Sequence, residues 1–218
     1  MVKKKSVRKG KNVEKTKRKS STNDRYGQYL KYVLISMGAL ILILVAAYFI
    51  IQSGKQFEFL GLQWDKQMFG EIKLYHAQIG IVKDGSAYVS DIFLRNDPRS
   101  LDIPNETIKF KRNIVYFSIN NSVGDNCKEG TSAFTDLGKF FATLGIEAKL
   151  ALSNESEAQK LNMPYVTCDN TLNSSVFMFQ GGEKTRVRSY GDCHIVEVAN
   201  CELTKAAETI MVGSIYRE

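Results

Sequence analysis

Residues 32–51 read YVLISMGALILILVAAYFII, and this stretch decides the architecture of the chain. It carries no charged residue, and Lys31 and Lys55 lie on either side of it. An α-helix of that length spans roughly 30 Å, the thickness of the hydrocarbon core of a bilayer. A buried helix of a soluble protein is rarely apolar on every face over so many turns. We therefore predict one transmembrane helix at about residues 32–51, within a membrane anchor at 26–54.

A cleaved signal peptide is the alternative interpretation of this stretch. The apolar run is longer than the core of a signal peptide, which has about 7–15 residues. Residues 46–48, Ala-Ala-Tyr, do not form the small-residue pattern at which such a peptide is cut. We therefore expect an uncleaved signal-anchor.

The charges of the chain are divided between two regions. The 218 residues have a formal net charge of +7, yet residues 1–32 carry twelve Lys or Arg and two acidic residues, a net charge of +10. The other 186 residues therefore have a net charge of −3. Because basic residues beside a transmembrane helix stay on the cytoplasmic side, we expect the N-terminus in the cytoplasm. We therefore predict a single-pass membrane protein whose C-terminal domain, residues 55–218, is extracellular.

The basic tail at residues 1–25 is rich in Lys and Ser and almost free of large apolar side chains. Such a segment buries too little surface to offset its chain entropy, so we predict a disordered cytoplasmic tail. Its expected partners are the lipid bilayer and the anionic lipids of the inner leaflet, because each basic residue there adds about 1 kcal/mol of attraction. We do not expect nucleic-acid binding, since the tail has no aromatic side chain to stack on bases and the rest of the chain is acidic.

Cysteines and glycosylation motifs occur only after the apolar stretch. The N-x-S/T sequons, candidates for N-glycosylation, begin at Asn105, Asn120, Asn154 and Asn173. The cysteines are Cys127, Cys168, Cys193 and Cys201. An even number of cysteines outside a membrane predicts disulfide bonds. Both features agree with an extracytoplasmic location.

Strand geometry constrains how these cysteines pair. If residues 194–199 are extended, Cys193 and Cys201 lie roughly 20–26 Å apart, whereas a disulfide needs Cα atoms within about 7 Å. Cys127 and Cys201 each lie where a predicted strand leads into a helix, and in parallel neighbouring strands these junctions share one sheet edge. We therefore prefer the pairs Cys127–Cys201 and Cys168–Cys193. The alternative, a zinc site, lacks a C-x₂₋₄-C pair, so we expect no metal and no other cofactor.

Residues 55–110 are predicted to be rich in strands. The run EIKLYHAQIGIV at 71–82 alternates between apolar and polar residues, as in a strand with one buried face. Asp84-Gly85 divides it from SAYVSDIFL at 86–94. This predicts a tight hairpin, because glycine readily adopts the positive φ of such a turn.

Residues 111–218 are predicted to form two βα units. In the first, the apolar run NIVYFSIN at 113–120 leads to the helical pattern TSAFTDLGKFFATLG at 131–145. In the second, HIVEVAN at 194–200 leads into the helical pattern ELTKAAETIMVGSIYR at 202–217. Shorter candidate strands lie between them at 147–152, 164–168, 174–179 and 184–190, with Gly181-Gly182 as a turn between the last two.

These patterns define an α+β fold class. We expect one N-terminal transmembrane helix, followed by an ectodomain with a mixed β-sheet and two main helices packed on it. The sequence leaves open whether the strands of residues 55–110 extend that sheet or form a separate layer.

Few residues of the chain point to catalysis. His76 and His194 each lie in a predicted strand, where a lone histidine is more often structural, so we assign no catalytic residue. The chain has no G-x-x-x-x-G-K-[ST], G-x-G-x-x-G, H-E-x-x-H or EF-hand motif.

The tetrapeptide YVTC at 165–168, with Arg186 and Arg188 downstream and a signal-anchor upstream, resembles the T-C motif and arginine of sortase transpeptidases. The resemblance implies a Cys168 thiolate that attacks a substrate carbonyl, assisted by a histidine and an arginine. It covers only these few residues, and the helix-rich second half departs from an all-β barrel. A disulfide at Cys168 would also remove the nucleophile.

Two groups of basic residues are candidates for anion binding. Arg95 and Arg99 flank a turn at 96–98, and Lys184, Arg186 and Arg188 line one face of a predicted strand. We favour a structural explanation for each group. The first is a solvated loop in which Asp97 caps the turn, and the second is an edge strand whose charges deter aggregation.

Two hypotheses about function remain. The first is a non-enzymatic interaction or assembly module, held at the membrane and bound to a protein or envelope partner that the sequence does not identify. The absence of a recognisable set of catalytic residues in the sequence favours this first hypothesis. The second is an envelope-modifying enzyme, for which a sortase-like thiol transpeptidase is the nearest match. A count of free thiols distinguishes the two, because a thiol enzyme needs one reduced cysteine.

Overall fold

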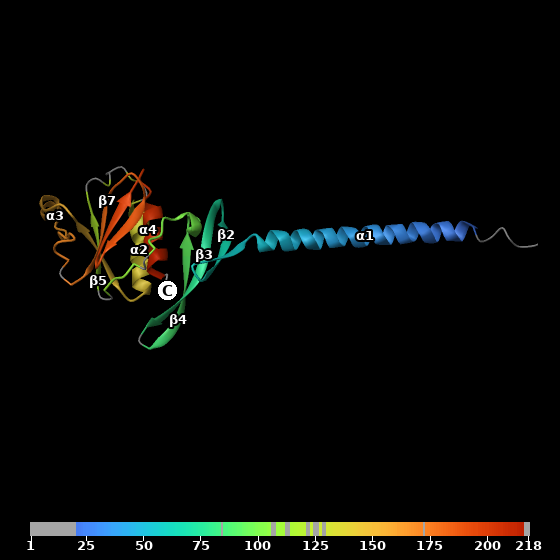
Figure 1. The fold of residues 1–218 in the computed structure, drawn as a ribbon, viewed down its shortest axis with the longest axis horizontal. Helices are drawn as coiled ribbons and strands as arrows, with labels where there is room; N and C mark the ends of the chain where they lie inside the picture. The colour runs from blue at the N-terminus through green and yellow to red at the C-terminus, as the bar shows by residue number, and fades with distance from the viewer. Residues whose placement is uncertain are drawn as a thin grey trace, which may run out of the picture. The chain divides into compact units, whose positions relative to one another are not determined.

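The computed structural model describes residues 21–83, 85–105, 108–111, 114–120, 123, 127, 130–171 and 173–215 (Figure 1). The chain divides into two compact units, Met1–Ser53 and Gly54–Glu218. Within the described ranges, the first unit holds one α-helix, and the second holds three α-helices, a short 3₁₀-helix and two β-sheets. The fold is therefore α+β, as expected.

Helix α1 (Ser21–Ser53) contains the apolar stretch that the sequence analysis singled out. Its segment Tyr26–Ile50 is long and apolar enough to cross a bilayer, and its side chains are exposed. Residues 21–25 are helical, although the tail was predicted to be disordered as far as residue 25. They include Ser, Thr, Asn and Asp, which favour a helix start. The remainder of the predicted tail lies outside the described residues.

The N-terminal sheet is an antiparallel meander in the order β1-β2-β3-β4. Its strands are β1 (Gln56–Phe59), β2 (Leu62–Phe69), β3 (Ile72–Lys83) and β4 (Ser86–Leu94). The predicted hairpin is confirmed, because β3 and β4 pair as far as Lys83 and Ser86, and Gly85 in the turn has a φ of +77°. These strands form a sheet of their own, which answers the question that the sequence left open.

The C-terminal sheet is mixed, with the strand order β6-β5-β7-β9-β8. Its strands are β5 (Ile114–Ile119), β6 (Glu147–Leu152), β7 (Ser175–Gly181), β8 (Arg186–Tyr190) and β9 (Cys193–Val198). The first four strands in that order are parallel, and β8 is an antiparallel edge strand. The apolar strands thus occupy the buried centre, as parallel strands do.

Three expectations about this sheet are wrong. β7 and β8 do not form a hairpin across Gly181-Gly182, because the apolar β9 lies between them and leaves the edge to β8. β9 likewise is not a neighbour of β5, since β7 separates the two. Residues 164–168 do not form a strand but contribute a single bridge, from Tyr165 to Leu152.

Helices α2 (Gly130–Thr143) and α4 (Leu203–Ile215) lie between the two sheets and share one hydrophobic core with both (Figure 1). Helix α4 is buried around almost its whole circumference, because it has a sheet on either side. The two main helices on one face of a mixed sheet were expected, and the separate sheet that the sequence left open lies on their far side.

Helix α3 (Glu155–Leu161) was not predicted from the sequence. The Asn154 side chain caps it by accepting hydrogen bonds from the backbone N–H groups of Ser156 and Glu157. An Asn followed three residues later by Glu is a helix-start signal that could have revealed it. With only seven residues, however, its apolar pattern is too short to read as a helix.

Candidate functional site

The N-terminal sheet has one face against the helices and one face in solvent. Alternate residues of β3, among them Tyr75, Ala77 and Ile79, are buried in the core. Their neighbours point to the opposite side, because side chains alternate along a strand. We call this side the outer face; its members used below are Asp65, Gln67, Phe69, Ile72, His76, Gln78, Val82, Val89, Asp91 and Phe93.

An Asp–His–Asp cluster lies at the centre of the outer face. His76 on β3 is directly opposite Asp65 on β2, and its Nδ1 atom is 2.7 Å from Asp65 Oδ1. Its Nε2 atom is 2.8 Å from Asp91 Oδ1 on β4. Ionised carboxylates only accept hydrogen bonds, so both contacts are satisfied together when the imidazole is protonated and donates from each nitrogen. The register of three strands therefore places the imidazole between two carboxylates.

The pKa of His76 is higher than its ordinary value of 6.5. Burial of the ring opposes protonation, but the hydrogen bonds to Asp91 and then Asp65 outweigh that effect. The same contact to His76 holds the pKa of Asp91 below its ordinary value, with help from Gln78. Both shifts favour the ion-paired form of the contact between His76 and Asp91.

Neighbouring side chains hold this cluster in place. Gln67 donates from Nε2 to Asp65 Oδ2 at 2.7 Å, and Gln78 donates to Asp91 Oδ1 at 3.1 Å. The Phe93 ring stacks on the imidazole of His76 with its centroid 4.8 Å away. A protonated imidazole gains from such a π face. The cluster is thus a preorganised polar surface.

Large apolar side chains surround the cluster on the outer face. Phe69 and Ile72 lie at the β2–β3 end, and Val82 and Val89 lie at the β3–β4 end. The exposed fractions of Phe69, Val82 and Val89 are 77%, 74% and 70%, and that of Phe93 is 52%. Single exposed apolar residues are ordinary, whereas several on one sheet face are less common in a soluble domain.

We expect the two histidines to titrate on opposite sides of pH 6.5. The pKa of His76 is raised by its carboxylate partners, whereas burial lowers the pKa of His194. The stability that His76 contributes is therefore full below pH 6.5 and is lost as the pH rises through its folded pKa. The contribution of His194 is full above pH 6.5 and is lost as the pH falls.

NMR titration of the two imidazoles in the full chain measures both values, and the variant His76→Gln assigns the signals. A second measurement follows the free energy of unfolding as the pH is raised from 6. This free energy should fall less steeply in His76→Gln than in the parent chain. A His76 signal that titrates below that of His194 would contradict the proposed protonation of the cluster.

His194 has a structural role in the described fold. Its Nε2 atom is 2.8 Å from the carbonyl oxygen of Lys109, to which it can only donate, and its Nδ1 atom is 2.9 Å from the hydroxyl of Ser189. The ring stacks on Phe177 at 4.6 Å between centroids. These contacts fit a neutral imidazole that ties segment 108–111 to the C-terminal sheet.

The cysteines form the two disulfides Cys127–Cys201 and Cys168–Cys193, the pairs expected from the sequence. Their Cα atoms are 5.3 and 5.4 Å apart. The first bond joins the β5–α2 and β9–α4 connections at one edge of the sheet. The second joins the connection before β7 to the start of β9. Cys168 therefore carries no free thiol, which removes the nucleophile that the sortase resemblance implies.

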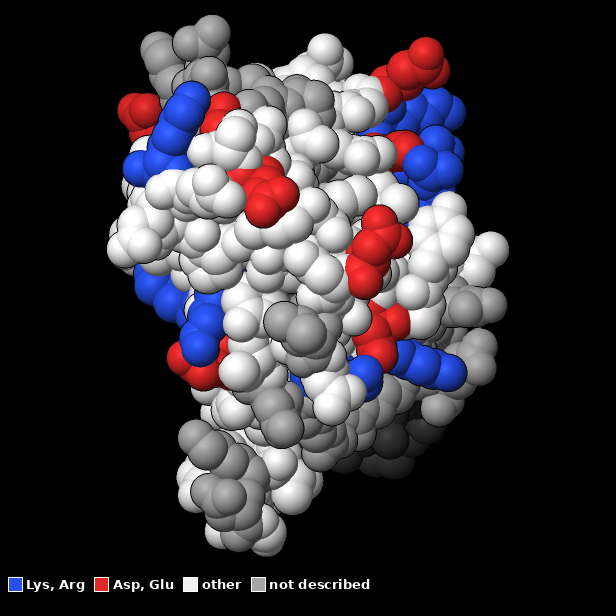
Figure 2. Space-filling model, turned by 90° about the vertical axis from the view of Figure 1, so that its left-hand side faces the viewer, with Lys and Arg blue, Asp and Glu red and all other residues white. Residues whose placement is uncertain are grey.

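The five basic residues named as candidate anion ligands do not lie together. Arg186 and Arg188 both bind the carboxylate of Glu197 on β9, and the contact to Arg186 lowers the pKa of that carboxyl. Lys184 is exposed just before β8. Arg99 pairs with Asp97 at 2.6 Å. On the side of the domain that carries α3, basic and acidic side chains are interspersed (Figure 2).

Arg95 lies next to a buried carboxylate that the sequence analysis did not single out. Glu208 of α4 accepts hydrogen bonds from the backbone N–H groups of Arg95 and Asn96 and from the Asn96 side chain. Burial raises the pKa of Glu208 despite these donors. The carboxylate thus fastens the end of β4 to α4. In the sequence, the only indication of this contact was a single Glu within the apolar pattern of α4. Anion binding by Arg95 stays a prediction.

The sequons lie at four separate places. Asn105, Asn154 and Asn173 are exposed, and Asn120 is half-buried at the end of β5. The Asn154 side-chain oxygen is engaged in capping α3. Glycosylation at these positions stays a prediction. Among the described residues, no cluster of three or more His, Cys, Asp or Glu side chains could hold a metal ion.

No family model, no curated protein and no solved structure matches this chain. The outer face, with its cluster and its exposed apolar side chains, is the best-defined candidate site.

Proposed function

We propose that the chain is a single-pass membrane protein whose C-terminal domain lies outside the cytoplasm and binds a protein partner through the outer face. The apolar segment of α1 and the two disulfides support the location, because disulfides persist in oxidising compartments. The charge difference across the apolar stretch supports the orientation.

The observation that carries the binding function is the exposed apolar set on the outer face. Phe69 and Phe93 are aromatic side chains of the kind that anchor protein interfaces. The Asp–His–Asp cluster between them supplies fixed charges, which select a partner with complementary polar groups. A flat sheet surface with both features suits another protein better than a small substrate, which needs a concave site.

Photo-crosslinking in sealed native cells tests this proposal. A benzophenone amino acid replaces Phe93 in one version of the full chain and Leu161 of α3 in the control, since Leu161 is 64% exposed but lies on a different element. We expect a discrete protein adduct from position 93 and none from position 161. Protease added outside the cells should digest the adduct, because the domain faces outward.

A second variant tests the role of the apolar side chains. With the benzophenone at position 69, Phe93→Ala should lower adduct yield about tenfold or more, since truncation of an interface anchor costs about 2 kcal/mol. Equal adducts from positions 93 and 161 would contradict the binding surface. An adduct that external protease leaves intact would contradict the orientation.

A further inference from the structure

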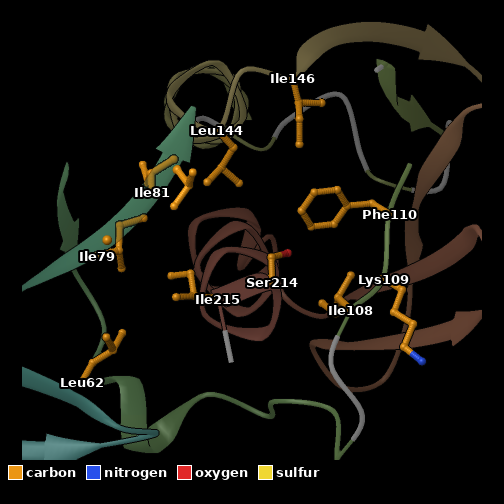
Figure 3. A pocket seen from close by; sticks show the side chains of 12 residues that line it. Leu62, Ile79, Ile81, Ile108, Lys109, Phe110, Leu144, Ile146, Ser214 and Ile215 are labelled. Atoms are coloured by element: carbon orange, nitrogen blue, oxygen red, sulfur yellow. The ribbon is translucent and has the colours of Figure 1, made fainter. Parts of the chain in front are cut away.

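A cavity of about 640 Å³ lies on the other side of the N-terminal sheet from the outer face. Its walls come from β3, from segment 108–110, from the connection between α2 and β6, and from the C-terminal end of α4 (Figure 3). The volume falls within the range of small-molecule pockets, about 300–1,000 Å³. The cavity is therefore large enough to hold a ligand.

Most of the side chains that line the cavity are aliphatic. Ile79 and Ile81 line it from β3, Leu144 and Ile146 from the α2–β6 connection, and Ile215 from α4. The Lys109 ammonium points away from the other labelled side chains (Figure 3). The lining thus offers no charged group to a ligand, which favours an uncharged methylene chain over a nucleotide or a sugar.

One polar atom in the lining lacks a partner. The hydroxyl oxygen of Ser214 is buried and makes no hydrogen bond to the described chain. A helical serine usually bonds back to a carbonyl of the preceding turn, and this one does not. Its oxygen lies on the side of α4 that faces Phe110 and the cavity (Figure 3). Native proteins rarely leave such a group unsatisfied, so a water molecule or a ligand oxygen is expected as its partner.

The wall beside Ser214 is fixed in position. Ile108 donates its backbone N–H to the carbonyl of Gly213 at 3.0 Å. A Cβ atom at Gly213 would lie 2.8 Å from Ile108 Cδ1, so only glycine allows this close approach without a shift. The wall beside Ser214 is thus formed by two closely packed segments.

We propose that this cavity binds one aliphatic chain of an amphiphile, with an oxygen of the ligand hydrogen-bonded to Ser214. A free fatty acid and an acyl chain of a phospholipid share this chemistry. The proposal does not rest on partner binding at the outer face, because the buried side chains of Ile79 and Ile81 form this wall of the cavity, and only Val82 belongs to both sites.

Photolabelling of the full chain in phosphatidylcholine nanodiscs tests the proposal. One arm contains palmitic acid with a diazirine on its chain, and the other contains phosphatidylcholine with the same diazirine acyl chain. After irradiation and digestion, we expect label on peptides that contain residues 79–82, 108–110 or 214–215 in at least one arm. Label on α1 measures how much probe each sample contains. The arm that labels the cavity identifies the source of the chain.

Three variants test whether the label reports binding in this cavity. Ile215→Trp fills the cavity from a half-buried position and should lower cavity label, relative to α1 label, about tenfold. Ser214→Ala removes the hydrogen bond and should lower it about fivefold. Leu161→Trp on α3 is the matched control and should change nothing. Formation of both disulfides and an unchanged unfolding temperature show that each variant folds.

Label confined to α1 in both arms would overturn the proposal. Undiminished cavity label in folded Ile215→Trp would do the same. If Ile215→Trp does not fold, Ser214→Ala decides the question, because it removes a single oxygen from a buried site and leaves the packing in place.

Discussion

Replacing Phe117 with Ala is expected to lower the free energy of unfolding by about 3–5 kcal/mol. Phe117 lies on β5, is 2% exposed, and is the centre of an aromatic cluster. The rings around it, at centroid distances of 5.7–6.3 Å, belong to Phe134, Phe141, Phe177 and Phe179. Truncation therefore leaves a cavity that α2 and two strands of the sheet cannot fill without losing their own contacts.

Denaturant unfolding of the full chain measures this effect. Trp64, the only tryptophan of the chain, is 1% exposed and belongs to the same core, so its fluorescence reports the unfolding of the domain. The control is Phe69→Ala, which deletes the same group from an exposed position and should change stability by no more than about 0.5 kcal/mol. Similar losses from the two variants would show that Phe117 does not occupy the core.

Removing the Cys127–Cys201 bond should destabilise the domain by about 4 kcal/mol. The two cysteines are 74 positions apart in the chain, and a cross-link over a long loop removes much entropy from the unfolded state. The double variant Cys127→Ser, Cys201→Ser should therefore unfold at markedly lower denaturant concentration, measured under non-reducing conditions.

The second disulfide is the matched control for the first. Cys168 and Cys193 are only 25 positions apart, so the variant Cys168→Ser, Cys193→Ser should lose about 1 kcal/mol less than the first variant. If the Cys168→Ser, Cys193→Ser variant lost more stability than the first variant, the Cys127–Cys201 bond would not restrain the unfolded chain as its loop length implies.

The two disulfides bear on the compartment in which the domain is located. A domain that depends on disulfides is stable only in an oxidising compartment, which agrees with the proposed placement outside the cytoplasm. The proposed partner of the outer face is a protein in that compartment, whereas the proposed ligand of the aliphatic cavity is of a kind that is abundant in membranes. Partner capture and lipid labelling thus examine two sides of one sheet independently.

Several features of this protein could be predicted because they depend on neighbours along the chain. The apolar stretch at 32–51, the alternation along β3 and the glycine turn before β4 are patterns of adjacent residues. The pair Cys127–Cys201 was preferred because cysteines at strand–helix junctions of parallel strands share a sheet edge, and Cys168–Cys193 was the pair that remained. Helix α3 was missed because a pattern of seven residues carries little signal.

The sequence by itself determined the apolar helix, the separation of its basic leader from an acidic remainder, and the two βα units, since each depends on local periodicity or charge. Only the tertiary structure decided that the first four strands form their own sheet, that β9 lies between β7 and β8, and that α4 is covered on both sides. It alone brought His76 between Asp65 and Asp91. Strand order and register depend on packing between residues distant in the chain, and local sequence does not encode which distant side chains will meet.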